Sequence, residues 1–505
     1  MNIEKIKLKT VVEDETEIIF SNLKLGKEKE STYSVLLGNN GNGKTACLEA
    51  VLNVFTNRFR TGLISSSSVV IDGREYTDEN NKSEIKKSKV KKVIVSTYSP
   101  FDRILQTERS LISKGELEDC VEIVYPQHDS QIVHSLCSSA YLKSQLYPSK
   151  KKVIDELSDF IGLDSNLLSL DIREITQIQG AGIVNKIDGL SIFEKKEMKK
   201  LIKQRTNLHK TEILKNDNRK NVLEVIESIR RSSRSSEYKE DVLCQFSILI
   251  EIKDHLKYFK KKYGKIINKR LLIDVDYLLR SYSEKYGQNF KKILSYDIDI
   301  LQKLNIHLVN NLLLKKNNRK IFLNQLSSGE FALFSRLMEI EASIEENSIV
   351  LIDEPETHLN PKWIFEYMNL LKKMFNDKNS SFIIASQSPF IVGVSKKENV
   401  YSLNVDKEKG NIKNVEKTTL GANYDEILKD IFGIGIHDNK ILTAYSDEII
   451  HKSKKNMIKA LNMTSDIAET SFKFNLLDNL LSEENTDVIE KQIQILRSDI
   501  DGGDQ

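Results

Sequence analysis

The sequence predicts an α/β fold that carries a large α-helical insertion, and two patterns lead to this prediction. Short apolar runs at residues 35–37 and 349–352 lead into a glycine-rich and an acidic loop, which is typical of buried parallel strands. Between about 120 and 300, glycine is sparse and apolar residues recur at helical spacing. We therefore expect a mixed sheet with flanking helices, interrupted by a helical segment.

Turn signals and alternating residues add an antiparallel β subdomain near the N-terminus. Residues 3–20 alternate polar and apolar, and residues 68–77 predict a hairpin with Asp72-Gly73 at its turn. A second hairpin is expected over 304–325, turning at Asn317-Asn318. The expected organisation is an N-terminal half of the head, a helical insertion, a C-terminal half of the head and a helical tail with an acidic end, at 1–119, 120–300, 301–440 and 441–505.

Composition excludes several classes of protein. In the 505 residues no apolar run approaches the 18 residues that would span a bilayer. The N-terminus also lacks the apolar core of a signal peptide. We therefore expect a cytoplasmic chain without a membrane partner. The four cysteines form no CxxC pair, so no zinc or disulfide framework is expected. Residues 195–270 carry 22 Lys+Arg against 10 Asp+Glu, a local charge of +12. This charge fits either nucleic-acid contacts or a solvated helical face.

The segment from Gly38 to Thr45 matches the pattern G-x-x-x-x-G-K-[ST] between an apolar strand and a helix. Glycines at such a loop let backbone N–H groups approach phosphates, and the following helix directs its N-terminus at the anion. Lysine supplies a charge to the β- and γ-phosphates, and the threonine hydroxyl is offered to Mg²⁺. We therefore expect bound ATP and Mg²⁺, with the phosphates held by Asn39, Gly41, Asn42, Gly43, Lys44 and Thr45.

Two carboxylates follow the apolar run 349–352, at the edge of the sheet where ligands bind in parallel sheets. Asp353 is expected to hold Mg²⁺ together with Thr45, directly or through water. Glu354 is expected to polarise the water that attacks the γ-phosphate.

A third motif, Leu326 to Glu330, precedes an amphipathic helix. Without a ligand, Ser327 is expected to cap this helix. In a dimer, its hydroxyl and the amides of Ser328, Gly329 and Glu330 are instead expected to face a γ-phosphate bound by the other copy, an anion that the helix dipole favours.

These motifs, in the order GNNGNGKT, LSSGE, LIDEPETHLNP and ASQSPF, resemble the head of ABC-type ATPases, and among them the RecF/SMC/OLD-like group. The resemblance covers about 1–110 and 300–440. It implies an ATP-hydrolysing homodimer or higher oligomer that closes head to head around ATP. It places Asn360 at the position of the D-loop acid.

The sequence departs from the family at two positions. The switch histidine of the family is replaced by Gln387, which can donate a neutral hydrogen bond but cannot carry a proton. We therefore hypothesise slow hydrolysis. No Q-loop glutamine is evident after 90–95, and Ser96, Thr97 or Ser99 remain the candidates to bind the water of the metal.

Two further segments, STYSPFDRI (96–104) and GANYDEILKDIFGI (421–434), resemble the PtuA-type ATPases of Septu and retron anti-phage systems. That resemblance implies a separate HNH-type (PtuB-like) nuclease as partner, and in retrons a reverse transcriptase with its RNA–DNA product. The alternative is a RecF/SMC-like DNA-repair or DNA-tethering ATPase that acts directly on DNA through the basic segment 195–270. We do not expect the chain itself to be a nuclease, since it shows no H-N-H pattern and the residues after 440 are too few for a Toprim domain.

Overall fold

The computed structural model of the protein describes residues 3–10, 15–20, 30–38, 41–56, 64–78, 88–97, 121–124, 130–172, 182–190, 192–211, 219–267, 270–403, 411–412, 414–433, 440–467 and 471–480. The chain forms two compact units, Met1–Glu416 and Lys417–Gln505, and each is described by itself. Among the helices in these ranges, none has the length and apolar character needed to cross a membrane.

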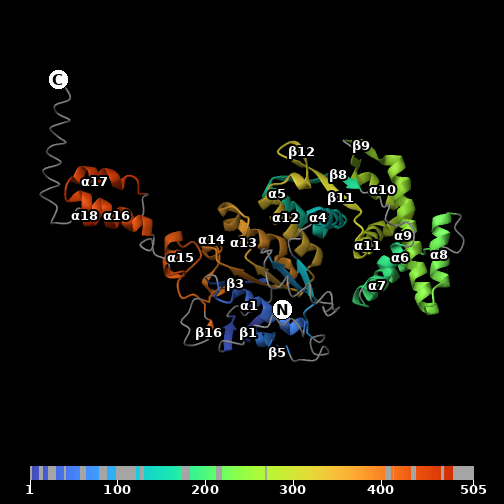
Figure 1. Ribbon diagram of the computed structural model, residues 1–505, viewed down its shortest axis with the longest axis horizontal. Coiled ribbons are helices and arrows are strands. Elements are labelled where there is room, and N and C mark those ends of the chain that lie inside the picture. The colour runs from blue at the N-terminus through green and yellow to red at the C-terminus, as the bar shows by residue number, and fades with distance from the viewer. Residues whose placement is uncertain are drawn as a thin grey trace, which may run out of the picture. The chain divides into compact units, whose positions relative to one another are not determined.

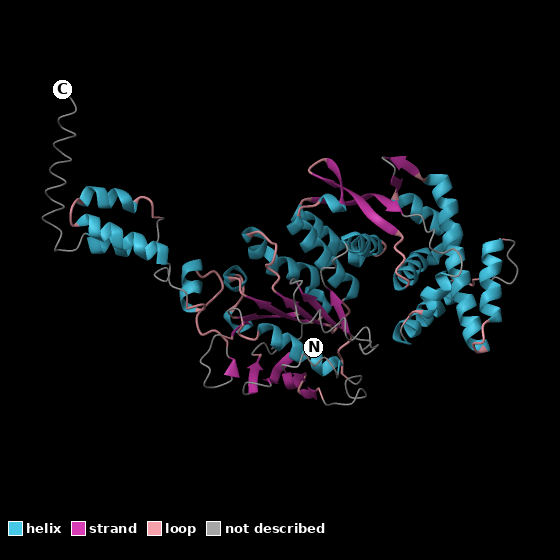
Figure 2. Ribbon diagram, in the orientation of Figure 1, coloured by secondary structure: helices cyan, strands magenta, loops and turns pink. Residues whose placement is uncertain are grey.

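A six-stranded sheet forms the centre of the first unit (Figure 2). Its order is β15-β3-β14-β13-β6-β7, and every neighbouring pair is parallel. Because the strands run the same way, their carboxyl ends meet at one edge, where parallel sheets bind ligands. The strands are β3 (Thr32–Leu37), β6 (Val93–Thr97), β7 (Val121–Val124), β13 (Ile349–Asp353), β14 (Ser381–Ser386) and β15 (Val400–Ser402).

Helix α1 (Lys44–Thr56) covers one face of this sheet. It packs in one apolar cluster with alternate residues of the strands, among them Leu36, Leu351 and Ala385. The same cluster contains residues of a second sheet, of order β16-β2-β1-β4-β5, so α1 lies between two sheets (Figure 1). The strands of this N-terminal sheet are β1 (Ile3–Thr10), β2 (Glu15–Ile19), β4 (Ile64–Ile71), β5 (Arg74–Thr77) and β16 (Asn411–Ile412).

Helix α13 (Pro361–Phe375) packs on the opposite face of the parallel sheet. Phe382 of β14 stacks on Tyr33 with ring centroids 4.8 Å apart and lies 5.8 Å from the ring of Phe375. The Tyr33 hydroxyl donates to the carbonyl of Leu371 at 3.3 Å. The other helices of this part of the head are α12 (Ser328–Ser343) and α14 (Pro389–Gly393).

The expected helical insertion also contributes strands. A third sheet has the order β12-β11-β8-β10-β9, and three of its strands come from the range 120–300. Two of these strands have only three and four residues, and all three lie among helical patterns, so their periodicity does not stand out from the sequence. The strands are β8 (Leu163–Ile172), β9 (Lys265–Ile267), β10 (Arg270–Ile273), β11 (Val309–Lys316) and β12 (Arg319–Phe322), and helices α4 (Ser130–Gln145) and α5 (Pro148–Ile161) contact this sheet.

Both predicted hairpins are present in the structure. Asp72 and Gly73 join β4 to β5, and Asn317 and Asn318 join β11 to β12. All four residues have a positive φ, between 47° and 77°, as a two-residue hairpin turn requires.

Six helices that follow β8 in the chain are called the helical lobe here: α6 (Gly182–Asp188), α7 (Ile192–Leu208), α8 (Lys220–Arg231), α9 (Ser236–Tyr263), α10 (Val275–Tyr286) and α11 (Phe290–Lys303). At its centre the guanidinium of Arg205 is fully buried, and its Nε donates to Asp297 Oδ1 at 2.6 Å. The other oxygen of Asp297 accepts from the Tyr282 hydroxyl at 3.1 Å. Because Arg205, Asp297 and Tyr282 come from α7, α11 and α10, this network ties three helices together.

The second unit is helical where the structure describes it. Its helices are α15 (Tyr424–Asp430), α16 (Lys440–Ser453), α17 (Met457–Thr464) and α18 (Ser471–Leu480). Phe472, Leu476 and Leu480 of α18 pack with Ile449 and Ala460 of the same unit. The apolar spacing after residue 471 therefore reflects an amphipathic helix packed in its own unit, while residues 481–505 lie outside the described ranges.

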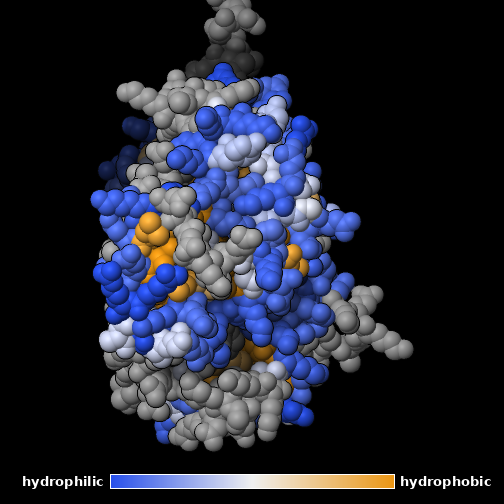
Figure 3. Space-filling view, turned by 90° about the vertical axis from the view of Figure 1, so that its right-hand side faces the viewer, coloured by the Kyte–Doolittle hydropathy of each residue, from blue (hydrophilic) through white to orange (hydrophobic). Residues whose placement is uncertain are grey.

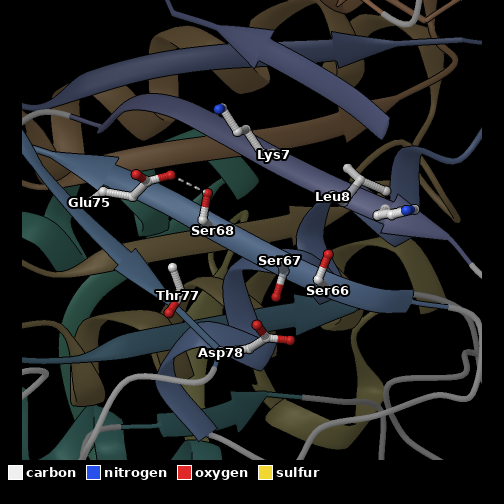
Figure 4. Close-up of a pocket in the computed structure, with 9 residues that line it drawn as sticks. Lys7, Leu8, Ser66, Ser67, Ser68, Glu75, Thr77 and Asp78 are labelled. Carbon is white, nitrogen blue, oxygen red and sulfur yellow. Dashed lines mark hydrogen bonds between the residues drawn. The ribbon is translucent and has the colours of Figure 1, made fainter. Parts of the chain in front are cut away.

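A polar pocket of about 310 Å³ lies on the N-terminal sheet (Figure 4). One side carries the Ser68 hydroxyl, which donates to Glu75 Oε1 at 2.8 Å. The pocket is lined by Lys7, Leu8, Lys9, Ser66, Ser67, Ser68, Glu75, Thr77 and Asp78, and none of the predicted site residues is among them.

The Arg205 network gives a prediction for stability. Replacing Arg205 with Met should lower the free energy of unfolding of the lobe by about 3 kcal/mol at pH 8, since the buried Asp297 carboxylate loses its partner. Burial raises the pKa of Asp297 to about 6 even beside Arg205, so at pH 5 the variant can protonate this carboxyl. The deficit should therefore be smaller at pH 5 than at pH 8 in urea unfolding followed by circular dichroism.

The matched control is Arg280→Met, which removes an exposed arginine of α10. A deficit for Arg205→Met that equals that of this control, or that is the same at both pH values, would contradict the prediction.

Candidate active site

The glycine-rich loop joins β3 to α1, as the sequence predicts. Gly41 and Gly43 have φ of 86° and 83°, a region that favours glycine. Lys44 is buried, and its Nζ donates to the carbonyl of Gly38 at 2.6 Å, so the amine lies against the start of the loop. Asn42 is exposed, whereas the predicted phosphate ligand Asn39 lies outside the described residues.

Thr45 and Asp353 meet although they are 308 positions apart in sequence. The Thr45 hydroxyl donates to Asp353 Oδ2 at 2.9 Å, which joins the first turn of α1 to the end of β13. The carboxylate is 5% exposed. This pair fits a Mg²⁺ site, because Mg²⁺ takes one or two protein oxygens and completes its shell with phosphates and waters. Elsewhere in the described ranges no group of three His, Cys, Asp or Glu residues is arranged to hold a metal.

Glu354 follows directly at the edge of the sheet. Its φ is 47°, an unusual value for a residue with a side chain, and its N–H donates to the carbonyl of Ala385 in β14 at 2.8 Å. The chain then turns, and the N–H of Thr357 donates to the Glu354 carbonyl at 3.1 Å. Strained residues of this kind are enriched at functional sites.

A carboxylate that the sequence reasoning did not single out, Glu356, connects this turn to the predicted switch residue. Glu356 Oε1 accepts from the Ser386 hydroxyl at 2.9 Å and from the backbone N–H of Gln387 at 2.8 Å. Burial raises the pKa of Glu356, although the hydrogen bonds from the Gln387 N–H and the Ser386 hydroxyl lower it in part. Its place in the sequence Asp-Glu-Pro-Glu was the available signal, since an acid two residues past Glu354 falls in the same turn.

The strand register distinguishes Thr97 from Ser96, two of the residues expected to take the role of the absent Q-loop glutamine. Thr97 pairs with Asp353, and residues paired in adjacent strands share a face of the sheet. This is the face that α1 covers, since Val93 and Val95 of the same strand pack against α1. Ser96 therefore points to the opposite face, and Ser99 lies outside the described residues.

The predicted signature motif begins α12. Ser327 caps the helix: its hydroxyl accepts from the N–H of Glu330 at 3.4 Å, and Glu330 Oε2 accepts from the N–H of Ser327 at 3.0 Å. Glu330 also pairs with Lys316 of β11. Burial alone would raise the pKa of Glu330, but the hydrogen bonds from Lys316 and the Ser327 backbone outweigh it, and the pKa is lowered. Ser327 and Ser328 are exposed, so they are accessible to another molecule.

The start of α12 also packs closely on the loop that follows Glu354. A Cβ at Gly329 would lie 2.7 Å from the carbonyl oxygen of His358, a separation that real Cβ atoms do not show. The buried Arg336, two turns along α12, donates to the carbonyl of Thr357 at 3.5 Å. The same loop ends at Asn360, whose side chain caps α13 by accepting from the N–H of Trp363 at 3.0 Å.

The structure thus places the predicted residues in two groups within the chain. Lys44, Thr45, Asp353, Glu354 and Gln387 all follow β3, β13 or β14, three adjacent strands, at their carboxyl ends. The signature residues Ser327, Ser328, Gly329 and Glu330 lie at the start of α12, against the loop that contains His358.

Residues 34–393 match a protein family described as "AAA domain, putative AbiEii toxin, Type IV TA system". The chain belongs to this family. The matched range runs from β3 to the end of α14, so the AAA domain contains the phosphate loop, the Asp353–Glu354 pair, the signature motif and the switch loop. Its parallel sheet, mixed N-terminal sheet and flanking helices are those of an ABC-like P-loop ATPase head with an inserted helical lobe, the fold class that the sequence predicts.

Among curated proteins, the chain is 24% identical over 412 residues to the retron Vc95 probable ATPase of Vibrio cholerae serotype O1 biovar El Tor, which covers 76% of this chain and 71% of that protein. It is 27% identical over 135 residues to the retron Ec83 probable ATPase of Escherichia coli, and 27% identical over 116 residues to protein ea59 of Escherichia phage lambda. The last two alignments span only 24% and 22% of those proteins.

Two of the solved structures to which the chain is similar are an Smc head domain and an ATP-binding cassette. The Smc head domain of Pyrococcus furiosus, bound to the C-terminal domain of ScpA, is 13% identical, with a TM-score of 0.30 over 82% of this chain and 96% of that chain. The ATP-binding cassette MJ1267 of an ABC transporter is 10% identical, with a TM-score of 0.29 over 86% of this chain and 98% of that chain.

Proposed function

We propose that this AAA-domain protein binds ATP and hydrolyses it slowly as a homodimer, with each ATP held between the phosphate loop of one copy and the signature motif of the other. The observation that carries the proposal is the hydrogen bond between Thr45 and the buried Asp353 carboxylate, beside Lys44 at the carboxyl edge of the parallel sheet. Two oxygens for Mg²⁺ and one cation for the phosphates are thereby already assembled in a single chain.

Within one copy, each residue has a distinct part. Lys44 would donate to the β- and γ-phosphates in place of its contact with the Gly38 carbonyl, and Thr45 and Asp353 would hold Mg²⁺. Mg²⁺, when bound, offsets the negative charge of the phosphate oxygens. Thr97 lies on the same face of the sheet as Asp353 and is our candidate to bind a water of the metal.

Hydrolysis depends on the turn after β13 and on the loop after β14. Glu354 orients the attacking water, as a carboxylate at the sheet edge can do. Gln387 donates a neutral hydrogen bond to the γ-phosphate, and Glu356 is a positioning residue that fixes the backbone of Gln387. A switch residue that cannot carry a proton favours a slow chemical step and a long-lived ATP-bound dimer.

The other copy supplies the signature. Ser327 and Ser328 are exposed at the N-terminus of the 16-residue helix α12, where the helix dipole favours an anion. A γ-phosphate at this position would replace the capping contact between the Ser327 hydroxyl and the N–H of Glu330. Asn360, at the start of α13, belongs to the loop expected at the seam of the dimer.

The dimer scheme is tested by two variants with opposite expected behaviour. Lys44→Ala should lose nucleotide binding, because the loop lacks its cation. Glu354→Gln should bind ATP and dimerise but hydrolyse it at least about 100-fold more slowly, since amide oxygen is a poor base. Sedimentation velocity with and without ATP, together with phosphate release, measures both. Equal dimerisation of the two variants with and without ATP would count against the scheme.

The switch loop gives a second test. Gln387→His should raise the single-turnover rate of ATP hydrolysis by about tenfold or more, because a positioned imidazole can transfer a proton. The matched control is Gln288→His, which makes the same exchange at an exposed position of the helical lobe and should leave the rate close to that of the unaltered protein. An unchanged or slower rate for Gln387→His would reject the explanation for slow turnover.

We further propose that the ATP-bound dimer regulates a separate HNH-type nuclease in anti-phage defence. The segments STYSPFDRI and GANYDEILKDIFGI and the two relatives named as retron ATPases support this proposal. Purification of the chain from its native locus should bring down a nuclease, and in a retron also a reverse transcriptase with its RNA–DNA product. Recovery of the chain without any nuclease, while the Glu354→Gln variant still dimerises with ATP, would reject the partner and leave the ATPase scheme intact.

A further inference from the structure

The last two turns of α9 carry a cluster of lysines on the helical lobe. Residues 257–263 read Lys-Tyr-Phe-Lys-Lys-Lys-Tyr, with four lysines and no acid. Lys257, Lys261 and Lys262 are exposed. Figure 3 views the molecule from the side on which Figure 1 draws the lobe, and hydrophilic residues dominate that face.

Several basic residues of the lobe are paired with neighbouring acids, unlike these lysines. Arg219 pairs with Asp254, Arg231 with Glu227, and Lys199 with Glu237 and Asp241. In the part of the chain that the structure describes, Lys257, Lys261 and Lys262 form no ion pair within 4 Å. The end of α9 is therefore one place where the positive charge of the segment 195–270 lies exposed and is not paired with an acid.

Aromatic rings are exposed among these lysines. Tyr258 is 60% exposed and Tyr277, at the start of α10, is 38% exposed. Tyr263 stacks on Tyr277 with ring centroids 5.1 Å apart and planes at 13°. The adjacent Phe259 is fully buried, so the core of the lobe is filled without the Tyr258 ring.

The cations and the rings are interleaved. Lys262 Nζ lies 4.9 Å from the centroid of Tyr263 and 5.8 Å from that of Tyr258. The hydrogen bond with Tyr263 raises the pKa of Lys262, so this amine is charged at neutral pH. Two carboxylates adjoin the cluster at the start of α10: Asp274 caps that helix by accepting from the N–H of Asp276. The cluster as a whole remains basic.

We propose that the surface formed by Tyr258, Tyr263 and Tyr277 with Lys257, Lys261 and Lys262 binds single-stranded nucleic acid. Phosphates are matched by exposed lysines, and unpaired bases can stack on exposed rings, which duplex bases cannot do. An acidic protein segment would use the charge but would leave the tyrosines without a role. The proposal does not depend on ATP binding, since the surface belongs to the helical lobe and not to the phosphate site.

Fluorescence anisotropy with the full chain and labelled oligo-dT and oligo-U tests this surface. Lys261→Ala/Lys262→Ala should weaken binding by about tenfold and reduce the slope of log K against log salt by about 1.4, two phosphate contacts at about 0.7 each. The matched control, Lys200→Ala/Lys203→Ala, removes two exposed lysines of α7 and should leave the affinity within about twofold.

A second pair of variants tests stacking. Tyr258→Leu should weaken binding by about tenfold, and Tyr258→Phe should retain it, because only the aromatic face is needed. Circular dichroism and thermal melting establish that each variant is folded. The Lys44→Ala variant should bind the oligonucleotides as well as the unaltered chain does, which separates this surface from the nucleotide site.

Binding of either oligonucleotide that is lost in the surface variants supports the proposal, and the two probes separate DNA from RNA. Absence of binding, or affinity unchanged in the lysine double variant, overturns it. Duplex DNA bound as tightly as oligo-dT, with no effect of Tyr258→Leu, also overturns it. Binding of a poly-glutamate peptide without binding of either oligonucleotide overturns it as well, because it would indicate a protein partner.

Discussion

The contact between Thr45 and Asp353 is the constraint on which the candidate site depends. It joins the helix after the phosphate loop to the end of β13, two strands away from the strand that leads into the loop. The buried strands β3, β14 and β13, paired in parallel, hold that edge in register. Thr45 and Asp353 would offer two oxygens at low exposure to a metal that prefers oxygen ligands. The packed sheet therefore fixes the positions of the site residues, and the loops at its edge carry the reactive side chains.

The strands beside the site, the two hairpins and the cap of α12 could be predicted from the sequence because each is signalled by neighbouring residues. The apolar run before Gly38 and the acids after Ile352 predict their strands and the edge at which they meet. The turn pairs Asp72-Gly73 and Asn317-Asn318 predict both hairpins, because few residues adopt a positive φ. Ser327 likewise caps α12 as expected for the chain without a ligand, and the structure adds Glu330 as the second member of a capping box.

Other features depend on contacts between distant segments and could not be predicted in this way. The strands β8, β9 and β10 are paired by tertiary contacts, although they lie in a stretch dominated by helical spacing. The role of Glu356 appears only when β14 brings Ser386 and Gln387 beside the turn after β13. The buried Arg205 and Asp297 are 92 positions apart. From the sequence alone, Arg205 belongs to the charge of residues 195–270, which predicts nucleic-acid contacts or a solvated face. The choice between Ser96 and Thr97 required the strand register.

Gly329 packs closely on the His358 carbonyl, and this contact affects the order in which two sites of a dimer would hydrolyse ATP. In a dimer of the proposed kind, the start of α12 would serve the pocket of the partner, while the turn containing Glu354 serves the pocket of its own chain. Because these two segments touch within one chain and Arg336 bridges them a second time, neither can shift without displacing the other. Loss of the γ-phosphate at one site would then also disturb the other site. Hydrolysis at the two sites of the dimer would therefore be coupled and not independent.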